Sequence, residues 1–391
     1  MTNSEREKEK EQFSFIENPE KINLLQTINE KLNINKHPNK KIVFVYSAPK
    51  VGSTSIISSL RIFGLDKLII IHIHDEIMLY VLTGLKGVTI NEIILYNKHL
   101  GRDVFVIDIY REPIERKISA YFEKIGAYHF NNTDVIMNTY NVNKVIKRFN
   151  RILPHISVGD HFMDTYNISY PEQFDFENKY LLIEQNGVKY IKLRLKDSEI
   201  WGNILTVIFG FTIRTIKDYE STNKPIKDLY SAFKHNYRIP LNLLTDIMQC
   251  KYLNYYLSKS ELEEYFGKWS QISCEKWDAF TVEQYLLYDE ITIENSHIDY
   301  VQTNHYMDDG CICKACVFKR AEIAHKLNQG RTLSANDRIN HEDAKNELLT
   351  KQVNHINRLN IAIQNKQNQP TPGKRKDFKR DMQTIVNGRN K

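Results

Sequence analysis

The chain has 391 residues and a net charge of +6, and hydrophobic residues make up 41% of it. This length can bury a large core, while so mild a positive charge excludes a dedicated nucleic-acid-binding protein and suits a protein with anionic ligands. No segment approaches the roughly twenty apolar residues of a transmembrane helix. The first residues are charged, unlike a signal peptide, and the five cysteines are an odd number. We therefore expect a cytoplasmic protein without a membrane span.

Three regions follow one another along the chain. Residues 1–40 form a polar lead-in with one helix near Pro19–Leu32. Residues 41–270 alternate strand-like and helix-like patterns, which predicts an α/β domain: a mainly parallel sheet between two layers of helices. Residues 271–391 form an extension that we expect to be mainly helical.

The first motif begins with the apolar run Lys41–Tyr46, which predicts a buried strand. A short loop with Lys50 and a single glycine, Gly52, then leads into Ser53-Thr54-Ser55 and apolar residues at helical spacing. Free N–H groups at a helix start, together with hydroxyls and a lysine, form a site for a phosphate or a sulfate.

The second motif follows Val104–Tyr110, a nearly continuous apolar run that predicts another buried strand. Pro113 suits the first position of the next helix, so Arg111 lies at a strand's carboxyl end and Ser119 two turns into that helix. Ligands of open parallel sheets bind outside these carboxyl ends. Two such units indicate one ligand with two separated anionic groups.

The two motifs resemble the signatures of the sulfotransferases that use 3′-phosphoadenosine 5′-phosphosulfate (PAPS). Their residues are most similar to those of the carbohydrate and capsular-polysaccharide enzymes. The first signature is Pro-Lys-x-Gly followed by three Ser or Thr, which Pro49–Ser55 matches in full. The resemblance covers roughly residues 40–270. The second signature, Arg-[Asp/Glu]-Pro-x-x-Arg-x-x-Ser-x-Tyr, is matched by Arg111, Glu112, Pro113, Arg116, Ser119 and Tyr121.

The resemblance implies a P-loop-like fold and a sulfotransferase that moves a sulfuryl group from PAPS to a hydroxyl or amine of a saccharide. Positioning and charge stabilisation dominate such a transfer. We expect Lys50 to stabilise the charge on the departing bridging oxygen. The 5′-phosphosulfate would be held by Gly52, Ser53, Thr54 and Ser55, and the 3′-phosphate by Arg111 and Ser119.

A base for the acceptor hydroxyl is expected at the end of the second predicted strand, Leu68–Glu76. His72 and His74 share one face of this strand, and family members place a His or a carboxylate in this part of the site. His74 is nearer the strand end, where Asp75 or Glu76 could orient its ring. The alternative is a pair of histidines satisfied by backbone groups within the sheet.

Three other interpretations stay open for the two motifs. A P-loop kinase-like phosphotransferase needs a lysine after the second glycine of its loop, whereas Lys50 precedes the only glycine, Gly52. An ordinary strand–helix turn would bind nothing. A non-catalytic descendant would keep the fold as a binding or scaffold module.

Later segments complete the predicted domain. Asn186-Gly187 between the runs Tyr180–Glu184 and Val188–Leu195 predicts a β-hairpin. Lys196-Asp197-Ser198 should cap the next helix, and Pro225–Trp269 has a helical pattern rich in aromatic residues.

The extension carries a possible structural zinc site and a basic tail. Three cysteines plus one histidine, either His305 or His325, would satisfy tetrahedral zinc, although reduced cysteines in a small loop fit equally well. An amphipathic helix is expected over Asn340–Gln364. We expect no nucleic-acid partner beyond weak, salt-sensitive contacts of the tail at 374–380. The three cysteines are Cys311, Cys313 and Cys316.

Overall fold

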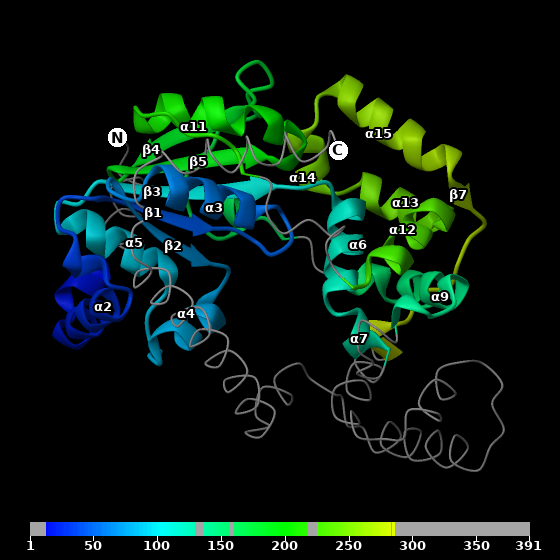
Figure 1. Cartoon of the computed structure of the whole chain (residues 1–391), viewed down its shortest axis with the longest axis horizontal. Coiled ribbons are helices and arrows are strands. Elements are labelled where there is room, and N and C mark those ends of the chain that lie inside the picture. Colours follow the sequence, from blue (N-terminus) through cyan, green and yellow to red (C-terminus); the bar gives the residue numbers. More distant parts are fainter. Residues whose placement is uncertain (1–12, 130–136, 157–158, 217–224, 283, 286–391) are drawn as a thin grey trace, which may run out of the picture. The chain divides into compact units, whose positions relative to one another are not determined.

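The computed structural model describes residues 13–129, 137–156, 159–216, 225–282 and 284–285. Their largest sheet has five strands in the order β2-β1-β3-β5-β4. Neighbouring strands are parallel except for β4, which is antiparallel to β5 (Figure 1). The predicted α/β class is therefore confirmed. The strands are β1 (Lys41–Tyr46), β2 (Leu68–Ile73), β3 (Val104–Tyr110), β4 (Tyr180–Gln185) and β5 (Val188–Arg194).

The two faces of the sheet are covered by different helices. Successive residues of β1 point to opposite faces, so they pack with different helices. Ile42 and Phe44 pack with α2 (Pro19–Lys31) and α5 (Ile90–His99). Val43 and Val45 pack with α3 (Ser53–Phe63) and α11 (Trp201–Phe209) on the other face. Helix, sheet and helix make the three predicted layers, and α2 confirms the helix expected near Pro19–Leu32.

The strand order places a topological switch point at the carboxyl ends of β1 and β3. The chain leaves β1 through α3 to reach β2 on one side, and returns through α4 (Glu76–Thr83) and α5 to β3 on the other side. Because β1 and β3 are adjacent parallel strands, the loops that follow them leave the sheet at the same edge. Open α/β sheets bind ligands at this edge.

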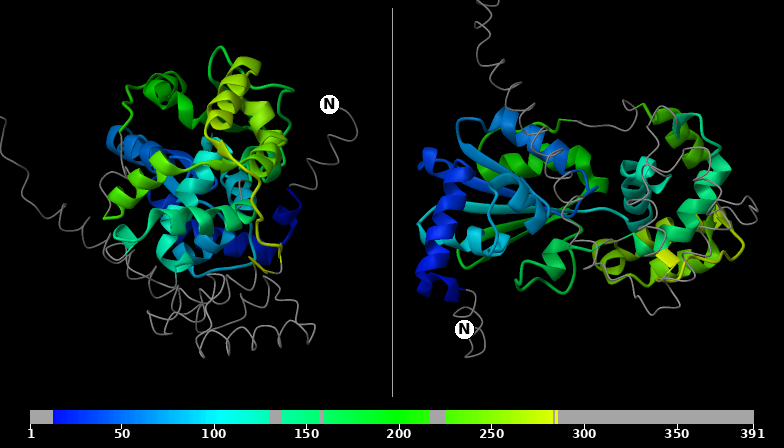
Figure 2. Two further views of the ribbon diagram at one scale, coloured as in Figure 1. Left: turned by 90° about the vertical axis from the view of Figure 1, so that its right-hand side faces the viewer. Right: turned by 90° about the horizontal axis from the view of Figure 1, so that it is seen from below.

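A second group of helices packs around its own apolar core, separate from those of the sheet. It includes the helix that begins at Pro113 as predicted, and the four helices of the predicted helical stretch 225–269. Figures 1 and 2 show this group at the end of the sheet where β3 leads into α6. The group comprises α6 (Pro113–Glu123), α7 (Ile125–Tyr128), α9 (Val142–Ile152), α12 (Lys227–Asn236), α13 (Leu241–Met248), α14 (Lys251–Tyr256) and α15 (Lys259–Gln271).

The predicted hairpin is confirmed, but the predicted helix cap after it is wrong. Asn186 and Gly187 have φ angles of 53° and 70°, as a tight turn between β4 and β5 requires. After β5 the chain forms a 3₁₀ helix, η4 (Leu195–Ile200), and α11 begins only at Trp201. The carboxylate of Asp197 does not cap a helix because the buried Arg194 binds it, with Nε 2.6 Å from Oδ2.

Short elements complete the described residues. Three are 3₁₀ helices, one is a four-residue helix, and two are short strands that pair in parallel. They are η1 (Ser14–Glu17), η2 (Ile34–Lys36), η3 (Leu153–His155), α10 (His161–Asp164), β6 (Ile239–Pro240) and β7 (Ser273–Cys274).

Several predictions for the extension lie outside the described residues. They include the zinc ligands Cys311, Cys313, Cys316 and His305, together with His325, the helix at 340–364 and the basic tail. Within the described ranges, no three His, Cys, Asp or Glu side chains are arranged to hold a metal ion. In the same ranges, every helix is too short or too polar to cross a membrane.

Candidate functional site

The loop between β1 and α3 adopts a backbone that favours glycine at two positions. Lys50 and Gly52 have φ angles of 67° and 94°, and a side chain in this left-handed region costs about 1–2 kcal/mol. A Cβ on Gly52 would lie 2.7 Å from Cδ1 of Leu195. Gly52 provides no side-chain cap for α3, so the first turn of the helix offers N–H groups to an anion, apart from that of Ser55, which donates to the Gly52 carbonyl at 3.2 Å.

Two arginines of the second motif bind the backbone of this loop. Arg111 donates from Nη1 to the carbonyl of Lys50 at 2.9 Å, and Arg116 donates from Nε to the carbonyl of Pro49 at 3.3 Å. The structure therefore brings the two predicted motifs together. The Nε atom of Arg111 is buried and has no hydrogen-bond partner among the described residues. A buried N–H of this kind is costly unless a ligand or water binds it.

Lys50 itself forms an ion pair with the end of α6. Its Nζ lies 2.8 Å from Oε2 of Glu123, and its side chain is 20% exposed. Ser119, the other residue predicted for the 3′-phosphate, lies one turn before Glu123 on α6 and is partly exposed. The loop lysine and the α6 serine thus belong to adjoining parts of one edge of the sheet.

A cleft of about 490 Å³ opens beside the first turn of α3. Ser55 of α3 forms one wall, Trp201 and Asn203 of α11 form another, and Arg214 and Thr215 complete it. The volume is typical of sites for small organic ligands. Because Ser55 belongs to both the predicted anion loop and the cleft, an anion at α3 would adjoin a ligand in the cleft.

His72 lies inside β2 and contacts the anion loop. Its Nε2 is 3.3 Å from Oγ of Ser53, the first residue of α3. Burial, together with the nearby His74 and Arg61, lowers the pKa of His72 to about 3. The imidazole is therefore neutral at pH 7 and serves as a hydrogen-bond partner of Ser53.

His74 is the first residue after β2, and its ring is held by the loop that follows β1. Nδ1 lies 2.5 Å from the carbonyl of Ser47. A carbonyl only accepts, so Nδ1 carries the proton and Nε2 of the neutral ring is an acceptor. Burial lowers the pKa of His74, and the charges of His161 and Lys50 add to this effect, whereas the Ser47 carbonyl and Asp75 oppose it.

The two carboxylates expected to orient His74 have other hydrogen-bond partners. Asp75 caps α4 by accepting from the backbone N–H of Met78 at 2.7 Å. Glu76 accepts from the backbone N–H of Ile90 at 3.4 Å. Asp75 therefore binds the first turn of α4 and Glu76 binds the first residue of α5, and the Ser47 carbonyl takes the place expected for them.

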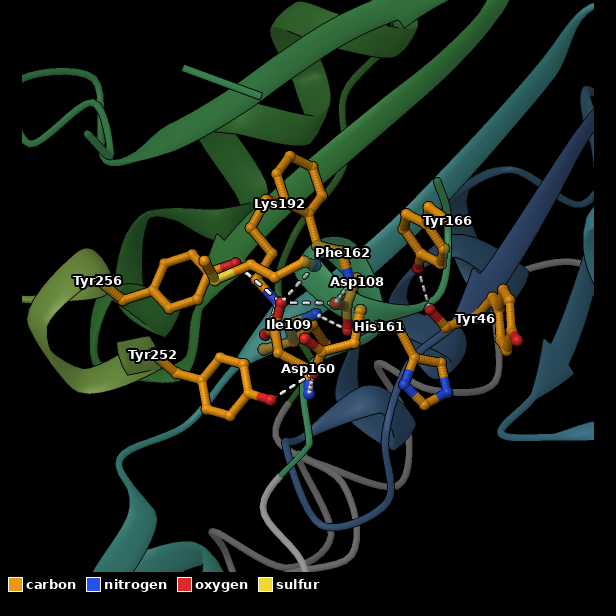
Figure 3. A network of polar contacts seen from close by, with 12 residues as sticks. Tyr46, Asp108, Ile109, Asp160, His161, Phe162, Tyr166, Lys192, Tyr252 and Tyr256 are labelled. Carbon is orange, nitrogen blue, oxygen red and sulfur yellow. Dashed lines mark hydrogen bonds and ion pairs between the residues drawn. The ribbon is translucent and has the colours of Figure 1, made fainter. Parts of the chain in front are cut away.

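A buried charge network lies beneath this edge (Figure 3). Lys192 of β5 donates to Asp108 of β3 at 2.7 Å and to Asp160 at 2.5 Å, and all three side chains are at most 5% exposed. Tyr256 donates to the other oxygen of Asp160 at 2.9 Å. Burial raises the pKa of Asp160, which Lys192 opposes. The network fastens the chain before α10 to the centre of the sheet.

Sequence reasoning did not find this network or the cleft. The available signal was Asp108, a charged residue within the otherwise apolar strand β3; β5 gave no such signal because it holds Lys189 and Arg194 besides Lys192. Such residues are rarely buried without a partner. The residues of the cleft had no comparable signal, because Arg214 and Thr215 follow α11 in an irregular segment.

Comparisons with known proteins add no relative. No family model matches the chain, and no curated protein matches it either.

Proposed function

We propose that this protein is a PAPS-dependent sulfotransferase that acts on a hydroxyl or amine of a saccharide. The observation that carries the proposal is the meeting of the two motifs: Arg111 binds the carbonyl of Lys50 at 2.9 Å, and its buried Nε lacks a partner in the described part of the chain. A negatively charged group beside Arg111 would satisfy this N–H and offset the cost of burying it.

The donor would occupy the loop and the cleft together. The N–H groups of Gly52, Ser53 and Thr54 and the hydroxyls of Ser53 and Thr54 would bind the 5′-phosphosulfate. Arg111 and Ser119 would bind the 3′-phosphate. The cleft beside Ser55 has the volume and the mixed aromatic and polar lining that suit the nucleoside.

The chemistry assigned to this arrangement is an in-line transfer. The acceptor oxygen or nitrogen forms a bond to sulfur, and the bond from sulfur to the bridging phosphate oxygen breaks. Its electron pair leaves with 3′-phosphoadenosine 5′-phosphate, while Lys50 stabilises the charge that grows on that oxygen. The acceptor proton passes to the base.

The contacts favour His74 over His72 as that base. With Nδ1 bound to Ser47, the ring of His74 has Nε2 as its acceptor. The corresponding atom of His72 faces Ser53 at 3.3 Å, and the pKa of His72 is about 3. We therefore assign His72 to the donor loop, where its hydrogen bond orients the Ser53 hydroxyl.

The saccharide acceptor and the cytoplasmic location rest on sequence alone. The acceptor class comes from the resemblance of the two motifs to carbohydrate sulfotransferases, and the location comes from the odd number of cysteines. A structural zinc in the extension is likewise a proposal from Cys311, Cys313, Cys316 and His305.

Titration calorimetry with three ligands tests the donor. We expect 3′-phosphoadenosine 5′-phosphate to bind the full chain, and ATP with magnesium or adenosine alone to bind far more weakly. Transfer of labelled sulfate from PAPS to a panel of saccharides then tests the reaction. Preference for ATP with magnesium would favour a phosphotransferase, and nucleotide binding without transfer to any saccharide would favour a binding module.

A further inference from the structure

His161 contacts the candidate base from a third part of the chain. Its Nε2 lies 2.6 Å from the backbone carbonyl of His74. Because that carbonyl can only accept, Nε2 of His161 is the donor. The ring also packs edge-on against Tyr46, the last residue of β1, with 4.7 Å between ring centroids.

The position of His161 is set by the interior of the sheet. The residue before it, Asp160, is bound by Lys192 and caps α10 through the N–H of Met163 at 3.0 Å. The residue after it donates its backbone N–H to Asp108, 3.0 Å away. Figure 3 shows His161 beside Tyr46 next to this network. Buried hydrogen bonds on both sides therefore fix where the imidazole lies.

His74 consequently has two independent anchors. The Ser47 carbonyl holds its ring through Nδ1, and His161 holds its backbone carbonyl. His74 needs both because it follows the last residue of β2 and therefore lies just outside the sheet. Without the second anchor, the backbone could rotate and the ring could leave Ser47.

We propose that His161 is a positioning residue for His74: its hydrogen bond holds the backbone of His74 so that Nδ1 stays on Ser47 and Nε2 stays the acceptor. The inference rests on the proposed function only in giving His74 the role of base. His161 itself touches no reacting atom in this assignment.

Two substitutions of His161 separate its hydrogen bond from its packing. His161→Phe keeps an aromatic ring against Tyr46 but removes the donor, whereas His161→Gln keeps an N–H donor at similar reach. In ¹⁵N-histidine NMR spectra of the full chain, we expect His74 to carry its proton on Nδ1 in the natural protein and in His161→Gln. In His161→Phe we expect a mixture of the two tautomers. His74→Gln identifies the His74 signals.

Turnover provides the second measurement. We expect kcat to fall about tenfold or more in His161→Phe, with KM for PAPS unchanged, because a displaced base slows the chemical step without weakening donor binding. His161→Gln should restore most of kcat. An unchanged His74 tautomer in His161→Phe would overturn the inference, whether or not the protein transfers sulfate. If His161→Phe fails to fold, loss of the Nδ1 proton signal in His161→Gln would also overturn it.

Discussion

Arg111 and Lys50, the central residues of the two motifs, are joined by a hydrogen bond from the guanidinium Nη1 to the backbone carbonyl, 2.9 Å away. The bond links the end of β3 to the loop after β1, where Lys50 has its left-handed φ of 67°. Arg116 adds a bond to the neighbouring Pro49 carbonyl. The loop conformation therefore depends on the second motif, and each motif is incomplete without the other.

Replacement of Arg111 tests whether the hydrogen bond between the two motifs supports nucleotide binding. We expect Arg111→Ala to weaken binding of 3′-phosphoadenosine 5′-phosphate by roughly 10- to 100-fold, because a charged hydrogen bond contributes about 1.5–3 kcal/mol. Calorimetry measures the change. Arg102→Ala is the control, since Arg102 precedes β3 at the other edge and binds the carbonyls of His37 and Lys40 at 2.8 and 3.1 Å. Equal losses in both variants would contradict the assignment.

The ion pair of Lys50 with Glu123 should compete with the donor. Glu123→Gln keeps the shape of the side chain and removes its charge, so Lys50 can turn to an anion without losing this attraction. We expect binding of 3′-phosphoadenosine 5′-phosphate to tighten about two- to fivefold, since a partly exposed pair contributes up to about 1 kcal/mol. Glu115 lies on α6, like Glu123, but pairs with Lys268 of α15. Glu115→Gln should therefore leave the affinity for 3′-phosphoadenosine 5′-phosphate unchanged. Weaker binding by Glu123→Gln would show that Glu123 helps to form the site.

Gly52 should resist substitution more strongly than another glycine with a positive φ. Gly52→Ala adds both backbone strain and a contact with Leu195, and we expect it to lower the free energy of unfolding by about 2–3 kcal/mol. Gly84→Ala has a similar φ, 73°, with no atom within 4 Å of its Cβ, and should cost only the strain, about 1–2 kcal/mol. Urea titrations measure both, and equal costs would mean that Leu195 moves aside freely.

Lys192 should matter for stability because it neutralises two buried carboxylates. Lys192→Met leaves Asp108 and Asp160 without their cation, and we expect a loss of about 3–5 kcal/mol in urea titrations at pH 7. The loss should shrink at lower pH, where the unpaired carboxylates can be protonated. Lys189→Met on the same strand is the control. Lys189 is 36% exposed and 3.8 Å from Asp103, so its loss should cost under about 1 kcal/mol. A similar cost for both variants would contradict the role of the network.

The buried histidines should make the protein less stable in acid. Burial lowers the pKa values of His72, His74 and His129 in the folded chain. The unfolded chain therefore binds more protons below about pH 6.5, and stability falls as the pH decreases from there. For His72 the fall continues until its folded pKa of about 3.

His72→Gln isolates the contribution of one of these groups. Between pH 6 and 4, its unfolding free energy should depend on pH less steeply than that of the natural protein, by up to about 1.4 kcal/mol per pH unit. Carboxylates common to both proteins cancel in this comparison. Parallel curves would mean that His72 is protonated equally in the folded and unfolded states.

The sequence alone was sufficient for the local structure that frames the site. Apolar runs predicted β1 and β3, Pro113 predicted the start of α6, and Asn186-Gly187 predicted the β4–β5 hairpin, because strands, first helical turns and tight turns depend on neighbouring residues. The helix cap predicted at residues 196–198 was wrong although the competing partner is also local: the buried Arg194, three residues before Asp197, binds its carboxylate.

Only the tertiary structure decided which polar groups meet. Arg111 with Lys50, His161 with His74, and Lys192 with Asp108 and Asp160 join residues far apart in the chain. Their proximity follows from the strand order β2-β1-β3-β5-β4, which periodicity does not encode. Hydrophobic pattern determines which segments are buried, whereas pairing across the sheet determines which buried charges and hydrogen-bonding groups compensate one another.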